Sequence, residues 1–381
     1  MTKKLYGRYA VILLLTICFA AALYLAGRVQ RTDLYQTEGR SFEKARVLEV
    51  LQDNVQESGQ SVGHQTVLLL MKTGSHRGEA LEASSSASYL YGAHCEPGMD
   101  VIATVNEGGG ELYVTVYSFD RSRILYLIVA LFLLTLWAVG GKQGIHAAIA
   151  LIFTFTAIIG LFIPMIYRGV SPVAAAILIA ILTTMVTMYM IGGPPAKVWA
   201  AIAATCIGVV LSGILAWSFG RVTRISGFNV SDIEQLEYVG QMTDIRIGEL
   251  LYAGILISAL GAIMDVAMSV ASAVHEIHTH APELSGKELY QAGIHVGRDM
   301  MSTMSNTLIL AFTGSSINML VFLYAYQYDV RQIINMYSIG IEIIQGISAT
   351  MGVILTVPAA AAISAGLLKS GRILKKQKNH L

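Results

Sequence analysis

Long apolar stretches alternate with short polar ones along most of this chain of 381 residues. A stretch of about 20 apolar residues can cross the hydrocarbon core of a bilayer as a helix. We identify the candidate spans as Tyr9–Gly27, Ile124–Val139, Ile145–Ile166, Pro172–Ile191, Val198–Phe219, Gly248–Val274, Thr303–Tyr326 and Ile341–Leu368. The pattern predicts an α-helical polytopic membrane bundle of about eight transmembrane helices.

One long polar region, Arg28–Arg123, interrupts this pattern after the first span. Short runs with strand-like composition, separated by glycine-containing turns, are Ala45–Leu51, Gln65–Lys72, Met99–Asn106 and Glu111–Phe119. Such runs predict a small all-β domain, either an antiparallel barrel or a sandwich. The expected organisation is therefore a membrane anchor (1–27), a β-rich domain (28–123), a seven-span membrane domain (124–368) and a basic tail (369–381).

The distribution of basic residues predicts how the chain is oriented in the membrane. The first apolar run is either a cleavable signal peptide or an uncleaved anchor, and its length favours the anchor. Eight spans place both termini on one side of the membrane, and Lys3, Lys4, Lys142, Lys197 and the tail lysines fall on that side. Cytoplasmic loops are enriched in Lys and Arg, so both termini are expected in the cytoplasm and the β domain outside it.

Composition supports a membrane protein and argues against other classes. The chain is 54% hydrophobic and only 13% charged, whereas soluble domains carry about 25% charged residues. A net charge of +1 gives no reason to expect nucleic-acid binding. The three cysteines are widely separated and imply no disulfide framework.

A polar stripe in the span Gly248–Val274 is the strongest functional candidate. Asp265 lies near its middle, and carboxylates at that depth are rare, costly and usually functional. Helical spacing extends this stripe through Ser269, Ser272 and Glu276. We expect it to face the bundle interior and to form a proton, ion or substrate pathway. The alternative is a hydrogen-bonded Asp265 that ties two helices together.

The following segment carries a matching polar stripe, made of Asp299, Ser302 and Asn306. Antiparallel packing of the two helices would place Asn306 at nearly the depth of Asp265. Glu342 and Gln345 begin the last span and are expected near one mouth of the same pathway. Farther along that span, Gly346, Ala349, Gly352 and Thr356 form a small-residue stripe, typical of a close-packed helix interface.

Histidines at the end of the Asp265 span allow a metal-binding alternative. His275, His278 and His280 lie there, and His295 follows after a polar loop. The spacing is not that of a zinc protease, so polar capping of the helix end is the preferred interpretation. No catalytic set and no cofactor is expected from the sequence.

Three segments that connect predicted spans have recognisable sequence signals. The runs Gly140–Gly144 and Gly192–Pro195 are typical of tight turns between helices. The connector Phe219–Gly248 contains Ser231–Val239, whose spacing predicts a short amphipathic helix at the membrane surface, either a gate or a passive link.

Three motifs resemble those of the YibE/F family of bacterial membrane proteins. They are GGKQG at Gly140–Gly144, GAIMDVAMSVASA at Gly261–Ala273 and GRDMMSTMSNTLILAFTGSS at Gly297–Ser316. This resemblance implies a multi-pass plasma-membrane protein and assigns no biochemical activity. A weaker likeness to the SecD/SecF-type half of the RND superfamily, with Asp265 and Asn306 in comparable places, implies proton-driven export.

Two functions are therefore expected. The first is a transporter or export factor, proton-coupled through Asp265. The second is a membrane scaffold or sensor, without transport, whose β domain binds a partner. The expected surroundings are the lipid bilayer and either a second copy of the chain or a membrane partner, with no nucleic acid.

Overall fold

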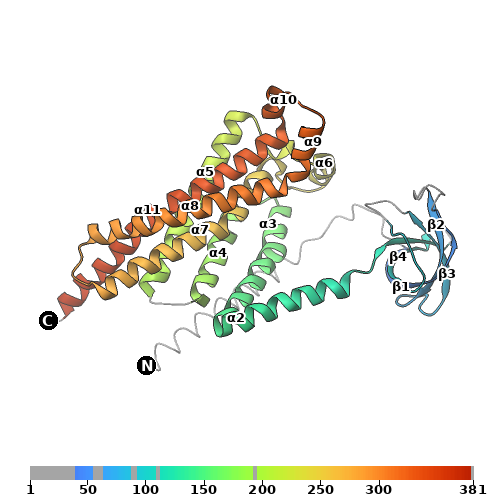
Figure 1. Ribbon diagram of the computed structural model, residues 1–381, viewed down its shortest axis with the longest axis horizontal. Coiled ribbons are helices and arrows are strands. Elements are labelled where there is room, and N and C mark those ends of the chain that lie inside the picture. Colours follow the sequence, from blue (N-terminus) through green and yellow to red (C-terminus); the bar gives the residue numbers. More distant parts are fainter. Residues whose placement is uncertain (1–38, 55–62, 87–91, 109–111, 192–194, 379–381) are drawn as a thin grey trace. The chain divides into compact units, whose positions relative to one another are not determined.

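The computed structural model describes residues 39–54, 63–86, 92–108, 112–191 and 195–378 (Figure 1). The predicted first span, Tyr9–Gly27, lies outside the described residues. Two compact units make up the described chain, and the division between them falls after Ala138. One unit holds the strands, and the other holds most of the helices.

Five strands form a closed barrel near the N-terminus. They are β1 (Arg40–Gln52), β2 (His64–Met71), β3 (Ala80–Ser86), β4 (Asp100–Asn106) and β5 (Tyr113–Phe119). Their order around the barrel is β1-β2-β3-β5-β4, and β1 pairs with both β2 and β4. The barrel confirms one of the two predicted alternatives. Its strands are not all antiparallel, however, because β3 and β5 run parallel.

Alternation of inward and outward side chains builds the barrel core. In β2, for example, Val67, Leu69 and Met71 are buried at every second position, because successive strand residues point to opposite faces. The long β1 carries two register shifts in its pairing with β2, and such bulges let a strand bend around a small barrel. The predicted runs correspond to β1, β2, β4 and β5. Strand β3 was not predicted, because its sequence ALEASSS lacks β-branched and aromatic residues.

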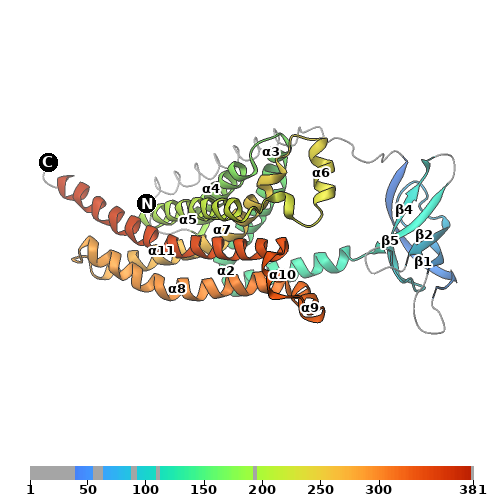
Figure 2. The same ribbon diagram turned by 90° about the horizontal axis from the view of Figure 1, so that it is seen from above.

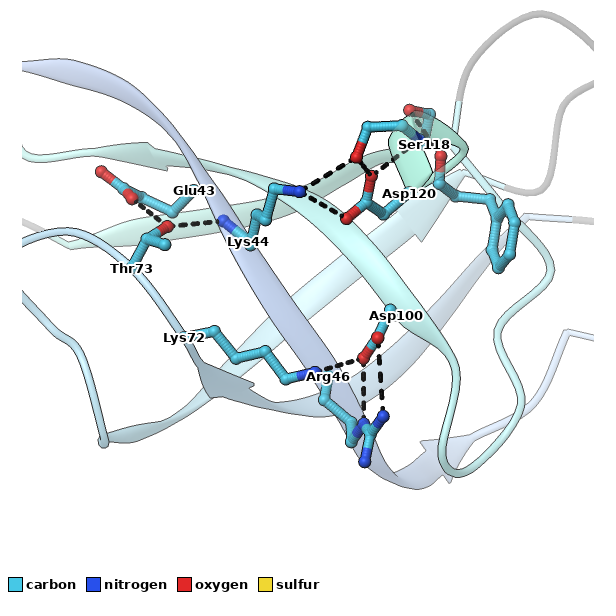
Figure 3. Close-up of polar contacts among 10 residues, drawn as sticks. Glu43, Lys44, Arg46, Lys72, Thr73, Asp100, Ser118 and Asp120 are labelled. Carbon is cyan, nitrogen blue, oxygen red and sulfur yellow. Dashed lines mark hydrogen bonds and ion pairs between the residues drawn. The ribbon is translucent and has the colours of Figure 1, made fainter. Parts of the chain in front are cut away.

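Polar contacts fasten the start of the first described helix to the barrel (Figure 3). Lys44 of β1 lies 3.0 Å from Asp120 and donates a hydrogen bond of 3.0 Å to Ser122, the first residue of helix α2 (Ser122–Ala157). Asp120 accepts hydrogen bonds from the hydroxyl and the backbone N–H of Ser122. The Ser122 hydroxyl and Lys44 together lower the pKa of Asp120 to about 2.

The second unit is built from helices (Figure 2). Beyond α2, its elements are the π-helix η2 (Ile158–Phe162), α3 (Ile163–Tyr167), α4 (Pro172–Ile191), α5 (Pro195–Thr223), the 3₁₀-helix η3 (Gly227–Asn229), α6 (Ile233–Gln241), α7 (Ile247–His280), α8 (Gly286–Ser315), α9 (Ile317–Ala325), α10 (Val330–Asn335) and α11 (Tyr337–Lys378). The predicted amphipathic helix in the connector is present as α6.

Five helical segments in the described part of the chain are long and apolar enough to cross a membrane, or six if a bent pair counts as one span. The segment Ser122–Tyr167 counts once among them, yet Gly141 has φ 54° and ψ −128° and breaks its helical backbone. This break falls within the predicted turn Gly140–Gly144. The described residues therefore show a largely helical membrane-type unit, whereas the full number of eight spans stays a prediction.

The predicted span Thr303–Tyr326 is not one continuous helix. Helix α8 begins at Gly286, and the direction changes by 61° between α8 and α9. Hydroxyl groups explain the break, because Thr313 and Ser315 donate hydrogen bonds to the backbone carbonyls of Ile309 and Phe312. Such bonds, beside a glycine, commonly bend helices.

Helix α7 is the centre of the membrane-type unit and packs against α4, α5, α8 and α11. Small residues permit this close packing. A Cβ atom added at Gly352 of α11 would lie 2.7 Å from Ser212 of α5, and the Ser212 hydroxyl donates a 3.1 Å hydrogen bond to the carbonyl of Ser348. The predicted close-packed interface of the last span is thus confirmed.

Candidate functional site

One side of helix α7 is not covered by other described residues, although the helix lies at the centre of the membrane-type unit. Gly254, Ser258, Gly261, Asp265 and Glu276 are exposed along it, and Ser269 and Ser272 are half-buried. The spacing of three or four residues places them on one side of the helix. The opposite side holds fully buried residues, including Ile263, Val266 and Val270. We call this line of residues the α7 stripe.

Asp265 differs from Ser258 and Ser272 of the α7 stripe in its bonding. Ser258 and Ser272 donate hydrogen bonds to the carbonyls of Ile255 and Met268, at 3.0 and 2.6 Å. Asp265 makes no hydrogen bond or ion pair with any described residue. The alternative in which Asp265 is hydrogen-bonded glue between helices therefore has no support within the described chain.

The polar residues of α8 also face outward. Asp299, Ser302 and Asn306 are exposed and make no side-chain hydrogen bond within the described chain. By contrast, Thr303 and Thr307 donate to carbonyls of their own helix. We call Asp299, Ser302 and Asn306 the α8 stripe.

Among the described helices, neither stripe faces the bundle interior, contrary to expectation. Helix α8 packs through its opposite side, where Gly293 and Gly297 are buried. A Cβ atom added at Gly297 would lie 2.2 Å from Val357 of α11. Close contact between α8 and α11 thus uses the glycine side of α8 and turns the polar side outward. No hydrogen bond between Asp265 and Asn306 occurs.

A hollow of about 480 Å³ lies beside the end of the α7 stripe. Ser272, His275, Glu276 and Thr279 of α7 line it together with Lys197 of α5. Two predicted pathway residues, Ser272 and Glu276, therefore lie beside Lys197, a residue expected only to mark the cytoplasmic side of the membrane. Lys197 lies about 80 residues away along the chain, so no local pattern could have linked it to this site.

The candidate histidines lie on helices α7 and α8 and do not form a cluster. Helix α7 continues through His275 and His278 to His280, whose Nε2 lies 3.2 Å from Glu276 Oε1. His295 is exposed on α8. In the described part of the chain, no group of three or more His, Cys, Asp or Glu side chains is placed to hold a metal ion.

A second hollow, of about 430 Å³, lies at the other end of α7. Phe228, Glu237 of α6, Arg246 and Glu249 are among its lining residues. Glu249 accepts a hydrogen bond from the Ser171 hydroxyl and lies 3.6 Å from Arg246. Sequence reasoning missed Glu249, although its position in the first turn of α7, where the helix dipole favours a carboxylate, was a usable signal.

Glu342 and Gln345 lie in the second and third turns of α11, and both are half-buried. Between them, Ile344 is buried against Ile255 and Tyr252 of α7 in a small apolar cluster. The structure thus places these two predicted residues beside α7, near the end opposite the histidines.

A comparison with protein-family models decides the family. The model of the YibE/F-like protein matches residues 128–370. The chain belongs to the YibE/F family. In this YibE/F protein the match covers both stripes and runs from within α2 to within α11, whereas the barrel precedes it. Family membership and the apolar helices together indicate a membrane protein. Neither curated proteins nor solved structures yielded a match.

Proposed function

We propose that this YibE/F protein is a transporter or export factor whose cycle is coupled to protons or another cation through Asp265. The observation that carries the proposal is a carboxylate in the middle of an apolar helix that has no partner among the described residues. Charged groups within membrane helices are costly, and they commonly mark ion pathways and proton relays. A group with no fixed partner is free to change its charge during a cycle.

The proposed pathway follows the α7 stripe. Its small residues leave open space, since a Cβ atom added at Gly254 or Gly261 would meet no atom within 4 Å. The stripe leads to the hollow with Glu276 and Lys197, so polar groups continue from mid-helix to the helix end. The proposed role of these residues is passage and charge transfer, and the proposal includes no enzymatic step.

The proposed setting is the bacterial plasma membrane. The excess of lysines near the termini and in the Lys142 and Lys197 turns supports cytoplasmic termini. The same orientation places the barrel outside the cytoplasm.

We also propose that a second copy of the chain covers the α8 stripe. Polar side chains in lipid need a hydrogen-bonding partner, and Asp299, Ser302 and Asn306 have none in the described chain. Around a twofold axis the same patch of each copy meets itself. Asn306, which is both donor and acceptor, suits such a self-complementary contact.

An infrared experiment tests the role of Asp265. We expect the pH-difference spectrum of the full-length protein in liposomes to contain a protonated-carboxyl component that Asp265→Asn removes. Asp232→Asn is a matched control, because Asp232 precedes α6 outside the apolar helices and its φ of 62° is readily adopted by Asn. A spectrum unchanged by Asp265→Asn would refute coupling through this residue.

The scaffold or sensor function remains the second candidate, and one observation favours it. The outer surface of the barrel exposes a group of aromatic side chains, and surfaces of this kind mark binding sites.

A further inference from the structure

Three aromatic rings stand on the outer surface of the barrel. Phe42 of β1 is 55% exposed, and Tyr113 and Tyr117 of β5 are 61% and 49% exposed. The Phe42 and Tyr117 rings meet edge to face with centroids 5.2 Å apart, and the Arg40 guanidinium lies 5.3 Å from the Phe42 ring. We call Arg40, Phe42, Tyr113 and Tyr117 the aromatic patch.

Strand pairing explains how the patch forms. Strand β4 lies between β1 and β5, and its Thr104 pairs with Phe42 on one side and with Thr115 on the other. Thr104 points to the outer face yet is only 6% exposed, because the larger side chains on both flanking strands cover it. The rings are therefore fixed by the register of three hydrogen-bonded strands.

A hollow of about 230 Å³ adjoins the rings. Tyr113, Tyr117 and Arg40 line it together with the hydroxyl-bearing residues Ser84, Ser86, Thr104 and Thr115. Aromatic faces offer flat apolar contact, and hydroxyl groups both donate and accept hydrogen bonds. A ligand that suits both has an apolar face and a rim of hydroxyl groups, which describes a pyranose ring.

Charge argues against a polyanionic ligand. Residues 40–120 contain eleven acidic and five basic residues, and nucleic acids require basic surfaces. Arg40 is the one charged member of the aromatic patch, and its guanidinium lies beside the Phe42 ring. The chemistry of the patch thus favours an uncharged sugar over a phosphate-bearing chain.

The barrel topology is that of a ligand-binding fold, although the aromatic patch lies on a different part of it. A closed five-stranded barrel in which β1 pairs with β2 and β4, and β3 lies beside β5, has the strand order of OB-fold barrels. These barrels bind oligosaccharides or oligonucleotides on the face of their second and third strands and on adjoining loops, whereas the aromatic patch lies on β1 and β5. Fold alone does not assign a ligand. Here the aromatic rings, the hydroxyl-lined hollow and the excess of acidic residues favour oligosaccharides over oligonucleotides.

We propose that the aromatic patch binds a pyranose ring of an uncharged glycan. The inference is independent of Asp265. It uses the proposed orientation of the chain only to name cell-wall glycan, as opposed to soluble saccharide, as the source of the sugar.

Isothermal titration of the full-length protein in detergent with a β-1,4-linked tetramer of N-acetylglucosamine tests the proposal. We expect saturable binding that Phe42→Ala and Tyr117→Ala each weaken by about tenfold, since one aromatic contact contributes about that much. Tyr117→Phe keeps the ring and should retain most of the affinity. Leu51→Ala, at a 50% exposed apolar residue near the other end of β1, is the matched control and should bind as the unchanged protein does.

Further measurements decide the ligand class and source. Binding that persists at high salt would support stacking of the sugar on the aromatic rings. Loss of binding at high salt would show that charge attraction holds the ligand and would overturn the proposal. Co-sedimentation with purified peptidoglycan, lost in Tyr117→Ala, would identify cell-wall glycan as the source; binding of the soluble tetramer alone would keep the site and reject that source. No titration signal, or equal weakening by Leu51→Ala, would refute the site while leaving the Asp265 proposal intact.

Discussion

Glycines decide how closely α8 approaches its neighbours. At Gly297, an added Cβ atom would lie 2.2 Å from a methyl carbon of Val357 and 3.2 Å from its Cβ, and a β-branched side chain has little freedom to move aside. We expect Gly297→Ala to destabilise the protein by roughly 1–3 kcal/mol, the usual effect of overpacking. Gly254→Ala, which meets no atom within 4 Å, should be neutral or slightly stabilising. Thermal unfolding in detergent compares the two, and equal effects would contradict the proposed close contact.

Asp120 predicts how the barrel responds to acid. Its pKa lies at about 2, below the ordinary 3.8, mainly because the Ser122 hydroxyl and Lys44 favour the charged carboxylate. A lowered pKa stabilises the folded state above the unfolded pKa, and this stabilisation disappears as pH falls from about 4 to about 2. We expect a contribution of at most about 2 kcal/mol, reduced by salt that screens the ion pair.

Hydrogen exchange of barrel amides across this acidic range measures the effect. Asp120→Asn should remove that part of the pH dependence. Glu96→Gln, at an exposed residue of the same barrel that makes no ion pair with a described residue, is a suitable control. An unchanged pH profile in Asp120→Asn would show that the contacts with Lys44 and Ser122 do not stabilise the fold.

At the scale of elements, the α8 stripe predicts a contact between two chains. In a variant with Cys18, Cys95 and Cys206 replaced by serine, we expect Asn306→Cys to form an intermolecular disulfide in native membranes on mild oxidation. Met304→Cys, which lies on the inward, half-buried side of α8, should form much less. Gel electrophoresis without reductant measures both. A monomer in both variants would contradict the proposed second copy.

The sequence predicted the helices α4, α5, α7 and α11 well, because each has a long apolar run between clear turn signals. It failed at the start of α8. There the capping box of Ser285 and Glu288 was a usable signal, but the polar composition that follows was taken for a loop. Periodicity also placed Asp265 and Asn306 correctly on stripes. It could not decide which way the stripes face, because that depends on which side of each helix has the glycines and small residues that its neighbours need.

At the scale of the whole molecule, the two units have separate hydrophobic cores. Val67 and Leu69 belong to the core of the barrel, and Ile263 and Val353 belong to that of the helical unit. We expect a chain lacking residues 40–119 to remain a folded membrane protein that keeps the Asp265 infrared signal and loses saccharide binding. Size-exclusion chromatography in detergent, followed by the two assays, checks this. Aggregation of the shortened chain, with the point variants still folded, would show that the barrel is needed for folding.

The closed barrel also has a consequence for the biogenesis of the protein. Strand β1 needs β4 as well as β2, and β4 and β5 are separated from it by more than 40 residues. During synthesis, the early strands must therefore wait with unpaired edges, which are prone to aggregate. The last strand ends only three residues before α2 begins. Completion of the barrel thus immediately precedes the emergence of the first described apolar helix, so the early strands need protection by a chaperone until synthesis has nearly reached that helix.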